Sequence, residues 1–80
     1  TTPMAMAQTV RRITTGKLLR KESREKLLGW MENTKTGTYR LRAGLPAAWR
    51  TGDKTGTGRT EGTTNKCNDI AITFPPGKNP

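Results

Sequence analysis

The sequence has no residues for an internal disulfide and none that favour a zinc site, the two cross-links that usually stabilise small folds. The 80 residues include one cysteine, Cys67, and no histidine, so an internal disulfide is excluded and a zinc site is not expected. Apolar residues make up 30% of the chain, and the only aromatic ones are Trp30, Tyr39, Trp49 and Phe74. In so short a chain, a core this thin leaves burial and conformational entropy close to balance. We therefore expect part of a larger fold.

The start of the chain agrees with that expectation. It opens on Thr1-Thr2-Pro3 without an initiator methionine, which fits an internal cut. No apolar run approaches the roughly 18–20 residues of a membrane span, and no signal peptide opens the sequence. The missing targeting signal therefore indicates nothing about where the protein resides.

The net charge of +9 raises nucleic acid or an anionic membrane as partners. The charges are spread along the chain, however, and no block of five or six like charges occurs. Acidic residues interrupt the densest basic region, which reads Lys21, Glu22, Arg24, Glu25 and Lys26. This pattern favours a solvated helix face over a phosphate-binding surface, and we expect neither nucleic acid nor membrane as a partner.

The first third of the chain predicts two helices. Thr2 followed by Pro3 is a hydroxyl N-cap with proline at the first helical position. An apolar stripe then recurs at helical spacing, and Thr14-Thr15-Gly16 ends the helix. The stripe consists of Met6, Val10 and Ile13.

We predict a second helix from Leu19 to Glu32. Its buried face is expected to consist of Leu27, Leu28, Trp30 and Met31. Glu22 and Lys26 form an i,i+4 pair on the exposed face. Gly29 inside the helix costs about 1 kcal/mol relative to alanine.

From Asn33 the composition changes to threonine and glycine, and Gly44-Leu45-Pro46 marks a turn. A strand is predicted from Trp49 to Thr57 and a second from Asp69 to Phe74, ended by Pro75-Pro76-Gly77. The expected class is α+β: two helices followed by an antiparallel β-hairpin. Two strands alone are marginally stable, so the helices or further strands must cover them.

The most informative stretch runs from Gly52 to Gly58. Three glycines in a strand usually mark a close approach to the backbone, and a lysine with two threonine hydroxyls accompanies them. An anionic ligand lying along the strand fits this chemistry, and a glycine-rich hairpin turn fits it equally well. A phosphate loop is excluded, because position 53 is Asp and Gly58-Arg59-Thr60 has arginine in place of lysine.

The residues before this stretch make it specific for one protein family. Arg42-Ala43-Gly44-Leu45-Pro46, Trp49 and Gly52-Asp53-Lys54-Thr55-Gly56-Thr57-Gly58 resemble the class A serine β-lactamases at the spacing of that family. Lys54-Thr55-Gly56 is the Lys-Thr-Gly box of those enzymes and of penicillin-binding proteins. The resemblance covers nearly the whole chain. It implies a C-terminal piece of the helix–sheet–helix sandwich, with a helical part in 1–33, a loop in 34–48 and the Lys-Thr-Gly strand, a rim loop and the next strand in 49–80.

The resemblance implies a role for five residues. Lys54 supplies positive potential for the β-lactam carboxylate, the Thr55 hydroxyl binds it, and Gly56 lets the substrate lie along the strand. Thr57 gives its backbone N–H as one of two oxyanion-hole donors.

Arg40 matches the position where some members place a guanidinium behind the carboxylate site, with a solvated loop arginine as the alternative. Arg42, Trp49 and Asp53 are expected to be structural, with Asp53 accepting from backbone donors.

The catalytic half of such an enzyme is missing from this sequence. The only serine is Ser23, and Ser23-Arg24-Glu25-Lys26 spells the Ser-x-x-Lys motif by coincidence, because it lies on a surface helix just upstream of Lys-Thr-Gly. No Ser-Asp-Asn follows. We expect this chain to orient a substrate without hydrolysing it.

The sequence also departs from the family between Arg59 and Asn68, where extra residues lengthen the loop at the rim of the site, and Cys67 is either an exposed thiol or an inert one. The resemblance implies a parent enzyme that is monomeric, periplasmic or secreted, acts on β-lactam antibiotics, and uses neither metal nor cofactor. A penicillin-binding transpeptidase fragment is the nearest alternative. A basic nucleic-acid-binding peptide is a more distant one.

Overall fold

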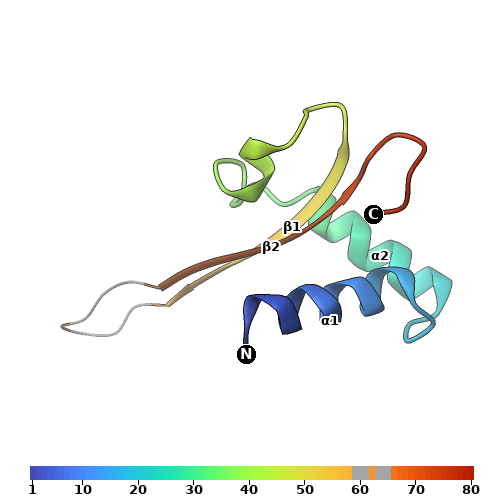
Figure 1. The fold of residues 1–80 in the computed structure, drawn as a ribbon, viewed down its shortest axis with the longest axis horizontal. Coiled ribbons are helices and arrows are strands. Elements are labelled where there is room, and N and C mark those ends of the chain that lie inside the picture. Colours follow the sequence, from blue (N-terminus) through green and yellow to red (C-terminus); the bar gives the residue numbers. More distant parts are fainter. Residues whose placement is uncertain (59–61, 63–65) are drawn as a thin grey trace.

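Two helices and a two-stranded antiparallel sheet make up the computed structural model, which describes residues 1–58, 62 and 66–80 (Figure 1). The elements, in order, are α1 (Pro3–Thr15), α2 (Lys21–Glu32), the 3-10 helix η1 (Leu41–Gly44), β1 (Arg50–Gly58) and β2 (Lys66–Phe74). The predicted α+β class, with two helices before an antiparallel hairpin, is confirmed.

Helix α1 has the ends that the sequence predicts. The Thr2 hydroxyl accepts a hydrogen bond from the Ala5 amide at 3.1 Å, Pro3 occupies the first turn, and Gly16 follows the last helical residue. This cap satisfies one of the amides that a helix start leaves without a partner. Within the described part of the chain, neither α1 nor α2 has the length and apolar character needed to cross a lipid bilayer.

Helix α2 begins two residues later than predicted, because Arg20 is extended (φ −61°, ψ 153°) and acts as the N-cap. The prediction that Trp30 is buried is wrong, since its side chain is 64% exposed. Leu28 and Met31 are three residues apart and share the face turned to the sheet, and Trp30 lies beside that face.

The exposed side of α2 also differs from the expectation. The salt bridges among the described residues join Arg42 to Asp53 and Arg50 to Glu32, so the predicted pair of Glu22 with Lys26 does not form. The ammonium group of Lys26 instead lies 5.5 Å from the centre of the Trp30 ring, a cation–π contact.

The two strands pair over nine residues each, from Arg50 opposite Phe74 to Gly58 opposite Lys66. Strand β1 is shifted by one residue from the prediction. Strand β2 begins at Lys66, three residues earlier than predicted, so Asn68 belongs to the strand rather than to a rim loop. The rest of the expected rim loop falls largely on residues 59–61 and 63–65, which lie outside the described residues.

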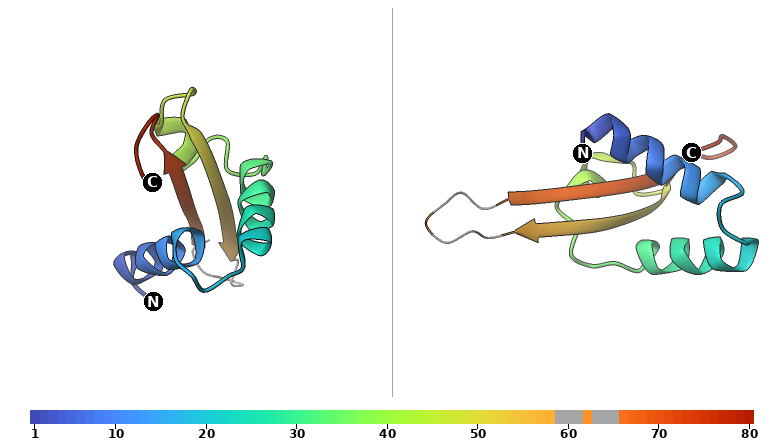
Figure 2. Two further views of the ribbon diagram at one scale, coloured as in Figure 1. Left: turned by 90° about the vertical axis from the view of Figure 1, so that its right-hand side faces the viewer. Right: turned by 90° about the horizontal axis from the view of Figure 1, so that it is seen from below.

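The sheet separates two environments. In Figure 1, α1 and α2 lie below the strands and η1 lies above them; in the right-hand view of Figure 2, seen from below, the two helices flank the strands. Gly52 faces the helices, because a Cβ built on it lies 2.9 Å from the Met31 Cβ. Side chains alternate along a strand, so Lys54 shares the helix side with Gly52, and Asp53 and Thr55 point to the η1 side.

The core is as thin as the sequence predicts. Its buried apolar residues are Leu28, Met31 and Ile72, and partly buried neighbours are Val10, Leu27 and Phe74. The radius of gyration is 13.8 Å, larger than the roughly 12 Å of a compact domain of this length. Large apolar side chains remain exposed, among them Met4, Leu18, Tyr39 and Leu41.

We therefore expect the isolated 80-residue chain to lack cooperative folding. Its few buried side chains cannot offset the conformational entropy of ordering the backbone. Differential scanning calorimetry of the purified chain should show no sharp transition on heating. A single two-state peak, with equal calorimetric and van't Hoff enthalpies, would contradict this expectation.

Candidate functional site

The Lys-Thr-Gly run lies in the middle of β1, and β2 occupies one edge of that strand. The described residues form a two-stranded sheet in the order β1–β2, so no strand among them pairs with the other edge of β1. Lys54, Gly56 and Thr57 are exposed, and Thr55 is half-buried. An extended backbone with an open edge and accessible side chains can accept a ligand that lies along it like a further strand.

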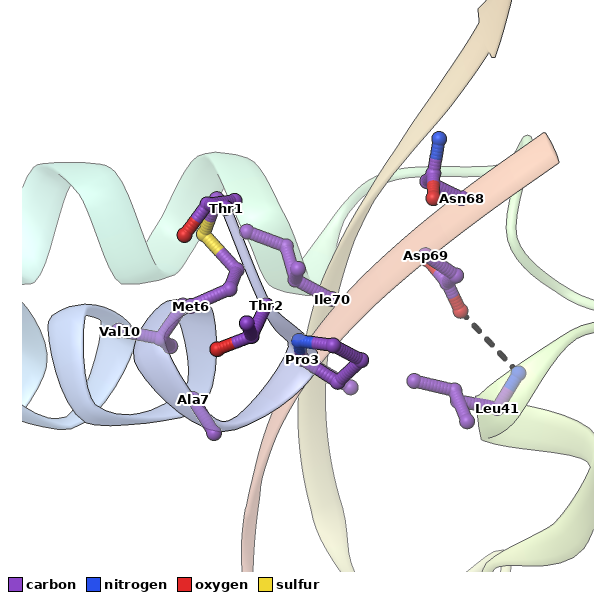
Figure 3. Close-up of a pocket in the computed structure, with 11 residues that line it drawn as sticks. Thr1, Thr2, Pro3, Met6, Ala7, Val10, Leu41, Asn68, Asp69 and Ile70 are labelled. Atoms are coloured by element: carbon purple, nitrogen blue, oxygen red, sulfur yellow. Dashed lines mark hydrogen bonds between the residues drawn. The ribbon is translucent and has the colours of Figure 1, made fainter. Parts of the chain in front are cut away.

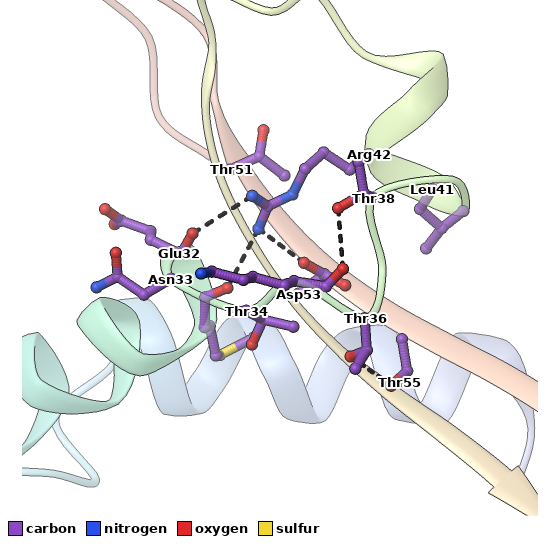
Figure 4. Close-up of polar contacts among 12 residues, drawn as sticks. Glu32, Asn33, Thr34, Thr36, Thr38, Leu41, Arg42, Thr51, Asp53 and Thr55 are labelled. Carbon is purple, nitrogen blue, oxygen red and sulfur yellow. Dashed lines mark hydrogen bonds and ion pairs between the residues drawn. The ribbon is translucent and has the colours of Figure 1, made fainter.

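The loop before η1 brings Arg40 to this strand on the η1 side. Its guanidinium donates to the Thr57 hydroxyl at 3.3 Å and to the Asn68 carbonyl at 2.8 Å. Farther along β1, the hydroxyls of Thr36 and Thr55 lie 3.0 Å apart (Figure 4). The structure thus gathers three of the predicted site residues, Arg40, Thr55 and Thr57, on one face of the strand.

Lys54 lies on the opposite face, toward the helices. Its ammonium donates to the Thr55 carbonyl at 2.7 Å. It lines a cleft of about 490 Å³ that is otherwise mainly apolar, with Val10, Ile13, Thr14, Leu27, Trp30, Met31, Thr34 and Ile70. The positive charges of Lys54 and Arg40 therefore flank β1 from its two sides, so an anion at the open edge of the strand lies within the field of both.

Beneath the exposed site lies a buried ion pair. The Asp53 side chain is fully buried, and its Oδ1 accepts from the Arg42 guanidinium at 2.7 Å (Figure 4). The same guanidinium donates to the carbonyls of Met31 and Glu32 at the end of α2. Arg42 is structural, as predicted. The expectation that Asp53 accepts from backbone donors is wrong: its partner is a side chain, because the guanidinium supplies charge as well as hydrogen bonds.

The sequence gives no hint of two further residues in this layer. Gly37 is buried against Asp53, and a Cβ built on it lies 1.6 Å from Asp53 Oδ2, so only glycine fits. Asp69 accepts at Oδ2 from the Leu41 amide at 3.1 Å (Figure 3). Burial raises the pKa of Asp69 above its ordinary value and the Asp53 carboxyl raises it further, whereas the Leu41 amide and Arg40 lower it.

A second cleft, of about 750 Å³, lies between the start of α1 and β2 (Figure 3). Its lining is mainly apolar and hydroxyl-bearing, and the ionisable side chain in it is Asp69. None of the residues predicted for the site on β1 lines this cleft.

Ser23 stands apart from these residues. It lies exposed in the first turn of α2, whereas the contact between α2 and Gly52 is made by Met31 near the other end of the helix. An exposed hydroxyl without a hydrogen-bonded base does not have the arrangement of an activated nucleophile.

A Lys-Thr-Gly strand flanked by two cations, with helices on one face of an antiparallel sheet, defines part of a class A serine β-lactamase. The sequence model of the Beta-lactamase enzyme family matches residues 1–80, and the chain belongs to that family. The resemblance that the motifs carry is therefore confirmed.

Named relatives agree with this assignment. The chain is 48% identical over 80 residues to beta-lactamase CTX-M-8 of Citrobacter amalonaticus, covering 100% of this chain and 26% of the relative. It is 47% identical over 79 residues to beta-lactamase 3 of Bacillus cereus, covering 99% of this chain and 24% of the relative. The chain thus spans about a quarter of the length of the curated relatives it matches.

Solved structures show the same local fold. An ancestral class A β-lactamase superposes with a TM-score of 0.84 at 53% identity, over 99% of this chain and 29% of that one. A β-lactamase from Xanthomonas campestris superposes with a TM-score of 0.82 at 50% identity, over 98% and 28% of the two chains. The two helices and the hairpin therefore form one portion of the class A β-lactamase fold.

The glycines of this portion give a matched pair of variants. We suggest a chimaera in which residues 1–80 replace the aligned segment of CTX-M-8. Gly52→Ala should lower its free energy of unfolding by about 1–3 kcal/mol, because the new Cβ overlaps Met31. Gly29→Ala should raise it by about 1 kcal/mol, since a Cβ there meets nothing within 4 Å. Urea denaturation measures both, and equal effects of the two changes would contradict the packing described.

Proposed function

We propose that the protein carrying this chain hydrolyses the β-lactam amide of penicillins and cephalosporins through an acyl-serine intermediate. In that protein, residues 1–80 supply the strand that binds the substrate carboxylate and one oxyanion-hole amide. The observation that carries the proposal is the placement of Lys-Thr-Gly on a strand with one open edge, with the Arg40 guanidinium bonded to Thr57.

The carboxylate of the antibiotic fits the charges on β1. The Thr55 hydroxyl donates to it in this proposal, and exchanges its present contact with Thr36 for the anion. Lys54 and Arg40 contribute positive potential from the two sides of the strand. A charge-assisted hydrogen bond of this kind contributes about 1.5–3 kcal/mol, which is the main source of binding energy we assign to this chain.

The reacting end of the substrate lies farther along the strand. Gly56 has no side chain to keep the substrate from the backbone, and a Cβ built on it meets only the Asn68 Cβ, at 3.9 Å. The Thr57 amide then donates to the oxygen that becomes negative in the tetrahedral intermediate. Loss of one such donor typically lowers kcat by about 10²–10³-fold.

The chain alone is proposed to be inactive. The sequence contains no Ser-Asp-Asn, and its one serine is on the exposed face of α2. We place the rest of the reaction, including the nucleophile and its base, in the part of the enzyme that these 80 residues do not include. The enzyme is proposed to be a periplasmic or secreted monomer that works without metal or cofactor.

The chimaera with CTX-M-8 tests the function directly. We expect it to hydrolyse nitrocefin, because CTX-M-8 provides the remaining segments of the fold, and we expect no turnover by the 80-residue chain. Spectrophotometric assays of both proteins decide the question. A folded chimaera without activity contradicts the proposed function. Turnover by the 80-residue chain that is lost on Ser23→Ala contradicts the proposal that the nucleophile lies elsewhere.

Arg40 is the residue with the sharpest individual prediction. Arg40→Ala in the chimaera should raise KM for a penicillin about 10-fold with little change in kcat, because it removes ground-state binding of the carboxylate worth about 1.5 kcal/mol. Arg12→Ala, an exposed arginine on α1, removes the same charge elsewhere and serves as the control. Equal KM values for the two variants would show that Arg40 is a solvated loop residue.

The alternatives predict different measurements. A penicillin-binding transpeptidase forms the acyl-enzyme and releases it slowly, so rapid multiple turnover by the full-length protein that carries this chain excludes that function. A basic nucleic-acid-binding peptide gives an affinity for DNA that falls steeply with salt. We expect only weak, nonspecific binding of this kind from the net charge of +9.

A further inference from the structure

Two carboxyl groups beneath the site are each satisfied at only one oxygen. Asp53 Oδ1 accepts from the Arg42 guanidinium at 2.7 Å, and Asp69 Oδ2 accepts from the Leu41 amide at 3.1 Å. The other two oxygens, Asp53 Oδ2 and Asp69 Oδ1, are buried and have no hydrogen-bond partner among the described residues. A buried acceptor without a partner costs about 1–3 kcal/mol, so two of them in one place require an explanation.

The strand register places the two acids next to each other. Asp53 pairs with Ala71 and Thr55 with Asp69, so the acids are diagonal neighbours on the same face of the sheet. Their side chains lie within hydrogen-bonding reach of each other. The Gly37 backbone closes over Asp53 Oδ2 from the loop side. The two oxygens without partners therefore belong to neighbouring side chains on the η1 side of the sheet.

A single proton resolves the conflict. Two carboxylates in contact repel each other and lose hydration, whereas one carboxylic acid facing one carboxylate makes a charge-assisted O–H···O bond that satisfies both free oxygens. The charged groups facing the pair are Arg42, bonded to Asp53, and Arg40, whose charge opposes protonation of Asp69. The Arg42 guanidinium bonds Asp53 and not Asp69, so we place the proton on Asp69.

We propose that Asp53 and Asp69 share one proton, and that this pair is a positioning element that holds Arg40 beside Thr57. The pair fastens the loop at two successive residues: the Leu41 amide to Asp69 and the Arg42 guanidinium to Asp53. Arg40 immediately precedes both, and its guanidinium reaches Thr57 and the Asn68 carbonyl. The positioning role rests on the proposed function of Arg40, whereas the shared proton does not.

The proton is tested first, without reference to activity. In the chimaera, the infrared band of a protonated carboxyl group should persist to a pH well above the ordinary aspartate pKa of about 3.9 and disappear in Asp69→Asn. The amide of that variant can donate to Asp53 in place of the shared proton. A band that titrates at the ordinary aspartate pKa, or one that survives in Asp69→Asn, overturns the proposal.

Stability gives a second readout with a definite sign. Because the pKa of Asp69 is raised in the folded state, its stabilising contribution is present at low pH and is lost as the pH rises through that pKa. The side-chain amide of the Asp69→Asn variant does not titrate. The thermal midpoint of this variant minus that of the parent chimaera should therefore increase as the pH rises. A difference that is independent of pH contradicts the shared proton.

The positioning role is tested by measuring KM and kcat separately. Asp69→Leu frees the Leu41 amide and should raise KM for a penicillin about 10-fold, like Arg40→Ala, with kcat little changed; Asp69→Asn should restore KM. Asp69→Ala replaces the leucine variant if that one does not fold. A loss that the asparagine fails to rescue, or an unchanged KM in Asp69→Leu, contradicts the role. An inactive chimaera that keeps the infrared band contradicts only the proposed function.

Discussion

The ion pair between Asp53 and Arg42 is the interaction on which the rest of this structure depends. One guanidinium bonds the centre of β1 through Asp53 and the end of α2 through the carbonyls of Met31 and Glu32. Arg42 itself belongs to η1, so three elements meet at a single side chain. Removing one partner of a buried pair typically costs about 3–5 kcal/mol, because the other charge is left without compensation.

This dependence on a polar contact follows from the small core. Leu28, Met31 and Ile72 are the buried apolar residues of the described chain, and they hold α2 to the sheet on one side only. On the opposite face, no apolar cluster of described residues fastens the loop that carries Arg40. Acidic side chains do so instead, with Asp53 and Asp69 bonded to successive residues of η1. The site and its support thus share the η1 side of β1: Thr55 and Asp53 face η1, whereas Lys54 faces the helices.

Much of this arrangement could be predicted from the sequence, because it is encoded locally. Thr2 and Pro3 define the start of α1, and the Arg-Ala-Gly-Leu-Pro frame with Trp49 and Lys-Thr-Gly identifies the family and places the site on a strand. The roles of Lys54, Thr55, Gly56, Thr57 and Arg40 stay predictions, although the structure gathers Arg40, Thr55 and Thr57 on one face.

What the sequence could not predict depends on contacts between distant residues. Trp30 looks like a core residue by composition, but helix rotation turns Leu28 and Met31 to the sheet and leaves Trp30 outside. Asp69 reads as an ordinary strand residue until the register brings it beside Asp53. Gly37 has no local signature at all, and its necessity appears only when the Asp53 carboxylate is found against its backbone.

The central claim is that β1 of this chain binds the substrate carboxylate and supplies an oxyanion-hole amide. The most direct measurement is a crystal structure of the CTX-M-8 chimaera with a penicillin bound as the acyl-enzyme. The carboxylate is predicted to contact the Thr55 hydroxyl between Lys54 and Arg40, and the ester carbonyl to accept from the Thr57 amide. A penicillin whose carboxylate lies away from β1 would contradict the claim.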